Sequence, residues 1–199
     1  MTLLHSLLSW IRRRILRDRR ARWNHQYSEG RWENLKQPEE DARFAAVADF
    51  LRQYARSGRV LEIGCGEALL QRRMGSMPFE RWVGVDVSDV AIARAQAFAG
   101  DTVQYVAADM VTYQPAGQFD AILFTESIYY VPACDRLLER YAQFLAPGGV
   151  FIISIFSDGR SERVWREIHA NTERVEGTTV VNERGTWISE VLKPRAPSR

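Results

Sequence analysis

The sequence contains few of the residues that build metal centres or disulfide frameworks. Its 199 residues include two cysteines, Cys65 and Cys134, and three histidines, His5, His25 and His169. These positions are scattered along the chain, and none of their spacings matches a zinc site or a set of paired cysteines. The composition therefore argues against a built-in metal site, so we expect no metal. It is typical of a protein in a reducing cytoplasm.

Internal repeats, low-complexity segments and apolar runs long enough to span a bilayer are also absent from the sequence. Patterns typical of strands and helices alternate instead from residue 38 to residue 175, which predicts a doubly wound α/β sheet. A chain of this length forms one domain with a substantial core. We therefore expect a single catalytic domain over residues 23–199.

Charge is unevenly distributed along the chain. Residues 1–22 contain seven arginines and one aspartate, a balance of +6 against −4 for the remainder, within a total of +2. A mildly acidic body argues against a broad nucleic-acid footprint. We therefore expect no nucleic-acid partner.

Residues 1–22 form a candidate basic amphipathic helix. Apolar residues recur there at helical spacing, and the arginines begin at position 12. Because the charges follow the apolar residues, the segment does not resemble a secretory signal. It suits an interfacial helix in peripheral contact with the inner face of the membrane, or a helix packed against the domain or a twin subunit. RNA binding through the arginines is a third interpretation.

Two short motifs predict a nucleoside site. Residues 60–66 form an apolar strand that runs into a Gly-x-Gly turn, and a second apolar run, 82–85, ends in Asp86, twenty positions after Gly66. In a βαβ unit this spacing places the turn and the carboxylate at the carboxyl ends of adjacent parallel strands. Glycines let the main chain approach a ligand closely, and Asp86 can accept hydrogen bonds from both ribose hydroxyls.

The residues after the turn discriminate between nucleosides. A dinucleotide fingerprint needs a third glycine, where this chain has Leu69, and Glu67 adds negative charge where pyrophosphate would bind. Glu62, just before the first glycine, suits a ligand that carries a cation and an amino group. Cys65, inside the turn, is interpreted as a small packing residue rather than a nucleophile.

The whole pattern resembles the class I S-adenosylmethionine (SAM)-dependent methyltransferases of the small-molecule type. These include enzymes similar to nodulation N-methyltransferases and members encoded with polysaccharide machinery. Residues 103–110 look like a third strand ending in Asp109-Met110, residues 119–126 like a fourth ending in Thr125-Glu126, and residues 145–154 like the Leu-x-Pro-Gly-Gly turn into a fifth. The resemblance covers roughly residues 23–194. Ala68 departs from it, because many members have glycine there.

The resemblance implies a Rossmann-like seven-stranded sheet, completed by a C-terminal β-hairpin over residues 178–182 and 186–192. It also implies SAM as cofactor. An aromatic stretch, residues 23–32, would fold over the cofactor as a lid, with ring faces near the sulfonium, or would simply pack the first helix, 39–54, onto the sheet. The implied cofactor-binding residues are Tyr27, Trp32, Glu62, Gly64, Cys65, Gly66, Asp86, Val87, Asp109, Met110 and Thr125.

The catalytic candidates are three residues: Glu126, Tyr129 and His169. A hydroxyl or ammonium nucleophile needs a proton acceptor within hydrogen-bond reach, and Glu126 is placed to act as that base or to anchor a cationic amine. The alternative is that Glu126 caps the following helix. Of Tyr129 and Tyr130, one would wall the acceptor pocket and the other would be core. His169, on a helical stretch, is the further candidate, with a structural role as its alternative.

We therefore predict a cytoplasmic SAM-dependent methyltransferase that acts on nitrogen or oxygen of a small molecule, or of an exposed glycan or lipid-linked acceptor. Residues 111–118 are too short for a full helix, which suggests a shallow, open acceptor pocket. A SAM-binding regulatory module without turnover is the main alternative. A nicotinamide-dependent oxidoreductase is disfavoured by Leu69. The oligomeric state stays open.

Overall fold

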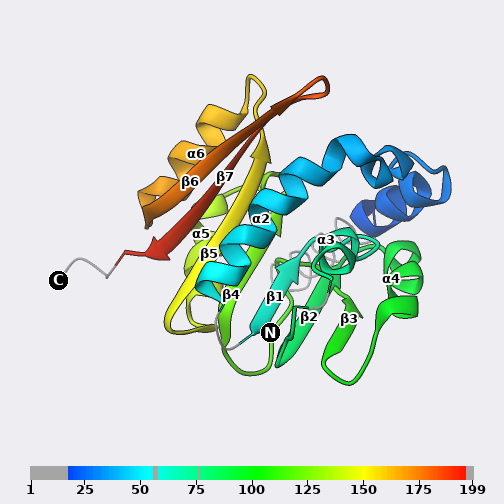
Figure 1. Ribbon diagram of the computed structural model, residues 1–199, viewed down its shortest axis with the longest axis horizontal. Helices are drawn as coiled ribbons and strands as arrows, with labels where there is room; N and C mark the ends of the chain where they lie inside the picture. The colour runs from blue at the N-terminus through cyan, green and yellow to red at the C-terminus, as the bar shows by residue number, and fades with distance from the viewer. Residues whose placement is uncertain (1–17, 56–57, 76, 196–199) are drawn as a thin grey trace, which may run out of the picture.

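A computed structural model describes residues 18–55, 58–75 and 77–195. Its centre is a seven-stranded sheet with helices on both faces (Figure 1). The strands lie in the order β3-β2-β1-β4-β5-β7-β6. Their bounds are β1 Arg59–Ile63, β2 Arg81–Asp86, β3 Val103–Ala107, β4 Phe119–Thr125, β5 Leu145–Phe156, β6 Thr172–Asn182 and β7 Gly185–Pro194. Within these ranges no helix is long and apolar enough to cross a membrane.

The strand pairing confirms the predicted Rossmann-like sheet. β1 pairs in parallel with both β2 and β4, so the strand order reverses at β1, where ligands bind in open α/β sheets. β7 runs antiparallel to both β5 and β6 and completes the sheet as a hairpin. Both hairpin strands are longer than predicted. Of the extra residues of β6, 172–177, four are exposed in succession and three are charged, so they lack the alternation that identifies a half-buried strand.

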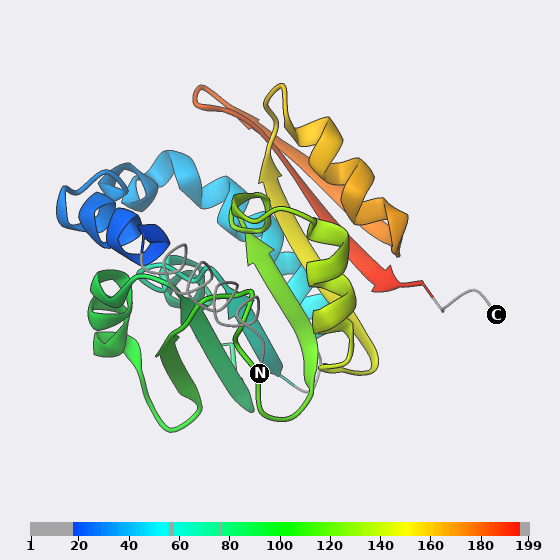
Figure 2. The same ribbon diagram turned by 180° about the vertical axis from the view of Figure 1, so that it is seen from behind.

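Five labelled helices flank the sheet. In Figure 1, α2 crosses one face, and Figure 2 shows α5 and α6 covering the other. No helix separates β3 from β4, as the length of that segment predicts. The α-helices are α2 Asp41–Tyr54, α3 Leu69–Arg73, α4 Asp89–Ala95, α5 Cys134–Ala142 and α6 Ser161–Ala170. Short 3-10 turns are η1 Glu33–Lys36, η2 Pro38–Glu40, η3 Gln96–Phe98 and η4 Ile128–Tyr130.

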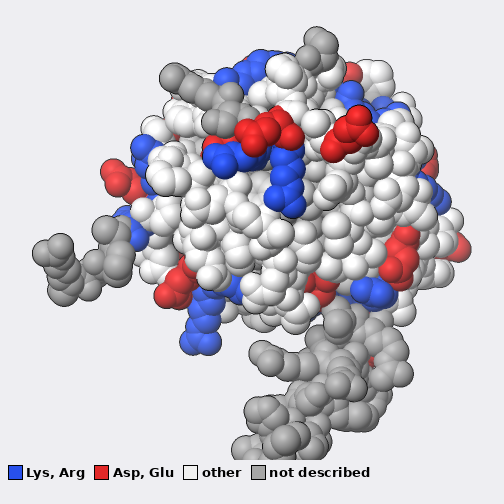
Figure 3. All heavy atoms as spheres, turned by 90° about the horizontal axis from the view of Figure 1, so that it is seen from below, with Lys and Arg blue, Asp and Glu red and all other residues white. Residues whose placement is uncertain are grey.

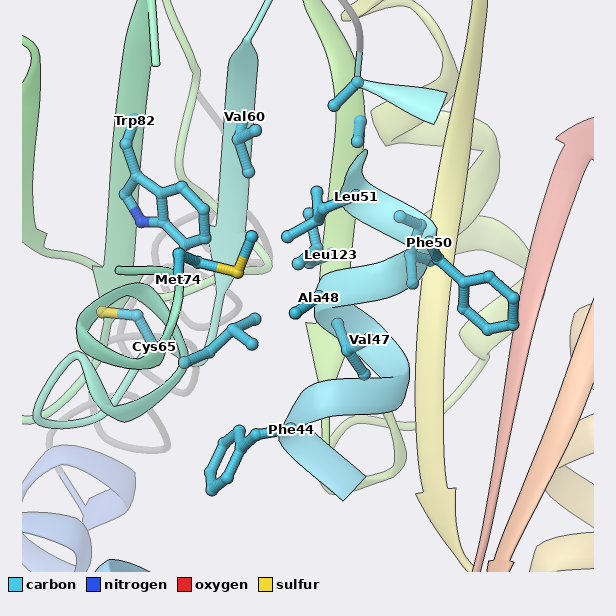
Figure 4. Packing of buried hydrophobic residues seen from close by; sticks show 14 of the residues in the cluster. Phe44, Val47, Ala48, Phe50, Leu51, Val60, Cys65, Met74, Trp82 and Leu123 are labelled. Carbon is cyan, nitrogen blue, oxygen red and sulfur yellow. The ribbon is translucent and has the colours of Figure 1, made fainter. Parts of the chain in front are cut away.

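The two helical layers bury opposite faces of each central strand. Val60 packs into the cluster under α2, while its neighbour Leu61 packs into the cluster under α5 and α6, and both are fully buried. Figure 4 shows Ala48 and Leu51 of α2 beside Leu123 of β4. Burial on both faces explains why the central strands are continuous apolar runs. Each large buried side chain contributes about 1.5–3 kcal/mol.

An additional helix, residues 18–28, lies beyond the carboxyl ends of β1, β2 and β3 (blue in Figures 1 and 2). The predicted boundary between residues 22 and 23 falls inside this helix. The apolar pattern of residues 3–15 lies outside the described residues, so the division into 1–22 and 23–199 stays a prediction.

Charges on the face shown in Figure 3 are mixed in sign. Basic and acidic side chains form small mixed groups there. Uncharged surface separates these groups, and neither sign forms a continuous stripe. This face therefore lacks the single-sign field that attracts polyanions.

Candidate functional site

A cavity of about 480 Å³ lies at the carboxyl ends of β1, β2 and β4. All eleven predicted cofactor-binding residues line this cavity, together with two of the predicted catalytic residues, Glu126 and Tyr129. The topology explains the convergence, because the carboxyl ends of parallel strands meet at one edge of a sheet. The structure thus brings together residues that are spread over 100 positions of the sequence.

The glycine turn after β1 requires both of its glycines. Gly64 and Gly66 have φ of 80° and 54°, a region that favours glycine. A Cβ on Gly64 would lie 2.3 Å from the Cβ of Ser127, and one on Gly66 would lie 2.7 Å from the hydroxyl of Tyr27. The main chain is therefore in close contact with the cavity walls at both positions.

Asp86 is fixed by the main chain around it. Its Oδ2 accepts from the Gly66 amide at 3.0 Å and its Oδ1 accepts from the Ser88 amide at 2.8 Å. Burial raises the pKa of Asp86 to about 6, although these amides oppose the shift. Each oxygen keeps a second lone pair. Asp86 can therefore accept hydrogen bonds from two neighbouring hydroxyls of a ligand.

Glu62 is a buried carboxyl group with an unused oxygen. It is 2% exposed, and its Oε2 has no hydrogen-bond partner within the described chain. Burial, assisted by the charge of Asp86, raises the pKa of Glu62 to about 8. A buried acceptor without a donor is costly. Glu62 therefore suits a ligand that brings a cationic N–H group.

Other unused polar groups gather around the same cavity. The described residues leave six buried side-chain polar atoms without a partner, and three of them line the cavity: Trp32 Nε1, Glu62 Oε2 and Thr125 Oγ1. Arg43, which sequence reasoning missed, is 2% exposed and also lines it. Its Nε donates to Glu40, and its charge opposes the rise that burial causes in the pKa of Glu126. Arg43 therefore brings a buried positive charge to the cavity.

One face of the 18–28 helix covers the cavity. Arg19, Trp23 and Tyr27 recur every four residues, so they share that face, and all three line the cavity. Arg19 Nη1 donates to Asp109 Oδ2 at 2.7 Å, and the ring of Trp23 packs edge-on against Tyr130 at 4.7 Å. The role of Arg19 was missed, although its spacing from Trp23 and Tyr27 is a signal that could have found it.

The helix is also attached to the cofactor side of the sheet through another face. Ser88 Oγ donates to Asn24 Oδ1 at 2.8 Å while it caps α4 by accepting from Ala91 N. Together with the placement of Tyr27 and Trp32 at the cavity, these contacts favour the predicted lid over a segment that only packs α2 onto the sheet.

The negative charge of Glu67 is balanced in the fold. Glu67 forms ion pairs with Lys36, at 2.7 Å, and with Arg94. Burial alone would raise the pKa of Glu67, but these two partners lower it overall. The charge of Glu67 therefore repels pyrophosphate less strongly than the sequence alone predicts. Ala68 has φ of 63°, which explains why a glycine suits this position in similar proteins.

Glu126 lies directly after β4 in a strained conformation. Its φ is 54°, uncommon for a residue other than glycine. Its Oε2 accepts from the Phe156 amide and from the Tyr129 hydroxyl, each at 2.9 Å, and its Oε1 accepts from Ser154 Oγ at 3.3 Å. Burial raises the pKa of Glu126. The alternative of a helix cap is wrong, because η4 has no side-chain cap.

Tyr129 and Tyr130 both line the cavity, and Tyr129 also packs against the core cluster under α5 and α6, so the expected division into one wall residue and one core residue does not hold. Their rings contact each other at 4.6 Å between centroids. Burial raises the pKa of Tyr129, so its hydroxyl stays protonated and donates to Glu126.

His169 is not brought to the cavity. It lies on α6, where its Nε2 is 2.7 Å from Glu190 Oε2 and its ring stacks on Trp165. α6 packs beside α5 and β6, and the side chain is held on that side of the sheet. The prediction that His169 reaches the acceptor pocket is therefore not supported by its position.

The far end of the cavity is built from residues that no motif identified. Phe156 ends β5, and Trp187 and Arg184 come from the hairpin. Arg184 Nη1 donates to Glu40 Oε1 at 2.7 Å and to the carbonyl of Asn34 at 2.8 Å, which fixes the hairpin tip against the segment before α2. The sequence predicted this turn, but only the topology places it over the cavity.

Comparison with known proteins identifies the family of this chain. Residues 36–189 match the family described as "Methyltransferase domain". A trans-aconitate 2-methyltransferase from Streptomyces avermitilis is 31% identical over 118 residues, which is 55% of this chain and 44% of that protein. A ubiquinone biosynthesis O-methyltransferase from Caulobacter sp. is 33% identical over 101 residues, 48% of this chain and 40% of that protein. The chain thus matches about half or less of the length of these relatives.

Solved structures share the fold. The N-methyltransferase NodS from Bradyrhizobium japonicum, in complex with S-adenosyl-L-homocysteine (SAH), has a TM-score of 0.69 at 20% identity, with 87% of this chain and 100% of that chain covered. Magnesium protoporphyrin IX methyltransferase from Synechocystis with bound SAM has a TM-score of 0.70 at 14% identity, with 89% and 96% covered. At these identities the likeness concerns the fold.

Proposed function

The chain belongs to the class I SAM-dependent methyltransferases, and we propose that it transfers a methyl group from SAM to nitrogen or oxygen of a small molecule. SAM is the cofactor of this family. The observation that carries the proposal is the set of unused polar groups in one cavity, which match the groups of SAM in chemical type.

The match extends over the whole cofactor. Glu62 would hold the ammonium group of its methionine part, and the Trp32 indole N–H, with the buried charge of Arg43, would hold the carboxylate. Asp86 would accept from the ribose hydroxyls, and Asp109 would face the adenine amino group. The other predicted cofactor residues, Tyr27, Gly64, Cys65, Gly66, Val87, Met110 and Thr125, would line the remaining contact surface.

The protein's own tasks in this reaction are alignment and proton removal. SAM, when bound, supplies an electrophilic methyl group and a neutral leaving group, so no acid is needed. Alignment alone is worth up to about 7–11 kcal/mol for well-oriented reactants. Glu126, fixed by Tyr129 and the amide of Phe156, is the proposed acceptor of the nucleophile's proton.

A glycan or lipid-linked acceptor is the second proposal. It is motivated by the Leu- and Arg-rich pattern of residues 1–22, which suits a cytoplasmic protein in peripheral contact with anionic lipid. The full chain should then float with anionic liposomes while a chain that starts at Trp23 stays behind. Equal flotation, or activity on soluble sugars without gain from lipid-linked ones, would remove this proposal.

Calorimetry with SAM, SAH and NADH tests the main proposal, followed by labelled methyl transfer to a panel of amines, phenols and carboxylic acids. We expect heat with SAM and SAH, none with NADH, and labelled product. The absence of heat with both SAM and SAH would overturn the assignment of the cavity. Binding without transfer to any acceptor would favour the regulatory module.

A further inference from the structure

A second cavity, of about 780 Å³, adjoins the first. It lies between the segment that follows η4 and the loop that joins β5 to α6, and four residues line both cavities: Tyr129, Tyr130, Val131 and Phe156. None of the proposed cofactor-binding residues lines it. The second cavity therefore extends the acceptor end of the site and not the cofactor end.

Two of the four shared residues also hold Glu126, the proposed base. The hydroxyl of Tyr129 and the amide of Phe156 both donate to Glu126 Oε2 at 2.9 Å. The same two residues line the second cavity. The two cavities therefore meet at these rings, beside the proposed base.

The chemistry of the second cavity suits an uncharged body. Val131, Ile155 and Val164 line it beside the shared rings. Its charged residues pair among themselves. Arg160 Nη2 lies 3.2 Å from Asp158 Oδ2, and Arg163 Nε lies 3.1 Å from Glu167 Oε1. These pairs leave the cavity without a charge of one sign to attract an ionic group.

We propose that the acceptor is an elongated molecule, with a hydroxyl or amino group beside Glu126 and an uncharged, apolar body in the second cavity. This rests on the proposed methyl transfer. Tyr130 and Phe156 are then residues that determine specificity, because the body of the acceptor must pass between the two cavities along them. A compact polar acceptor would leave the apolar lining unused.

Two glycines offer a matched pair of variants. Gly159 lines the second cavity, and a Cβ built on it meets no atom within 4 Å. Gly100 has the same open space but lines neither cavity. Neither residue has a left-handed φ. Gly159→Phe should therefore add a ring to the lining of the second cavity without backbone strain, and Gly100→Phe controls for the added ring.

The probes are 4-alkylphenols and 4-alkylanilines with tails of one to six carbons. Transfer of a labelled methyl group to each probe is measured. In the unmodified chain, kcat/KM should rise up to about fourfold for each methylene that enters the cavity, from the transfer free energy of a buried methylene. Gly159→Phe should abolish this dependence, while Gly100→Phe keeps it. Both variants should bind SAH within about twofold of the unmodified chain, because neither residue lines the cofactor cavity.

The proposal would be overturned if kcat/KM of the unmodified chain did not depend on tail length. It would also be overturned if the two variants showed the same dependence on tail length. If no probe is methylated, calorimetry of the same probes with SAH-loaded protein decides. Tail-dependent binding that Gly159→Phe removes would support the assignment of the second cavity and count against the proposed function. Binding that does not depend on the tail would overturn the second cavity as an acceptor site.

Discussion

The two ends of the main cavity are built in different ways. At the cofactor end, ligand groups are provided by the glycine turn after β1 and by carboxylates near the carboxyl ends of the strands, such as Asp86, which ends β2, and Asp109, two residues after β3. At the acceptor end, the lining is mainly aromatic, with Tyr130 and Phe156 among its rings, and comes from segments far apart in the chain. The cofactor end thus depends on backbone geometry at the strand ends, whereas the acceptor end depends on side chains that the topology brings together.

The largest expected effect that separates the two ends is at Glu126. Glu126→Gln keeps an oxygen that can accept from Phe156 and Tyr129 but removes the proton acceptor. We expect kcat to fall by about 10²–10⁴-fold, with the affinity for SAH unchanged. Steady-state transfer and calorimetry measure the two quantities.

Glu139→Gln is the control for this change, because Glu139 is exposed on α5 and lines neither cavity. It should leave both quantities unaltered. An unchanged kcat in Glu126→Gln would mean that Glu126 only supports the fold between β4 and β5.

The same contrast explains how much the sequence could predict. Gly64, Gly66 and Asp86 were found because a βαβ unit fixes their spacing within one short stretch, and the strand order followed from the alternating pattern. Arg43 and Trp187 were missed because they meet the cavity only through the packing of α2 and the hairpin, which leaves no local pattern. A lone histidine on a helix suggested a site, but its register on α6 turned it toward Glu190.

Asp86→Ala should weaken cofactor binding without affecting the acceptor end. The change removes the two charge-assisted hydrogen bonds proposed to the ribose, and it leaves the Gly66 and Ser88 amides without an acceptor. We expect the affinity for SAH to fall roughly 100-fold, since two such bonds are together worth about 3 kcal/mol. Calorimetry measures the loss, and Asp101→Ala, at an exposed aspartate, is the control. An affinity within threefold of the unmodified chain would contradict the ribose assignment.

Glu62 should make cofactor binding depend on pH. Its pKa is raised from an ordinary value of 4.5 to about 8, so the cofactor-free fold retains a proton that the unfolded chain releases. This stabilisation is fully present below about pH 4.5 and is lost as the pH rises toward 8.

A cationic ammonium group beside Glu62 would favour its ionised form, so SAH binding near pH 7 should release up to about one proton. The affinity should then rise by up to about tenfold per pH unit toward pH 8. Calorimetry in two buffers of different ionisation enthalpy measures the released proton. Glu62→Gln should abolish the release. Equal heats in both buffers would show that no cation is placed at Glu62.

The smallest effect is expected at His169, because its ring is engaged by Glu190 and Trp165 away from both cavities. His169→Gln should keep kcat and KM within about twofold, and losing the contact of the ring with Glu190 should cost about 1 kcal/mol of stability. Steady-state kinetics and a thermal melt measure both. Mutating a residue that supplies an essential proton acceptor would lower kcat without moving the melting temperature. That result for His169 would require α6 to move toward the acceptor end during turnover, and the assignment of the base to Glu126 alone would then fail.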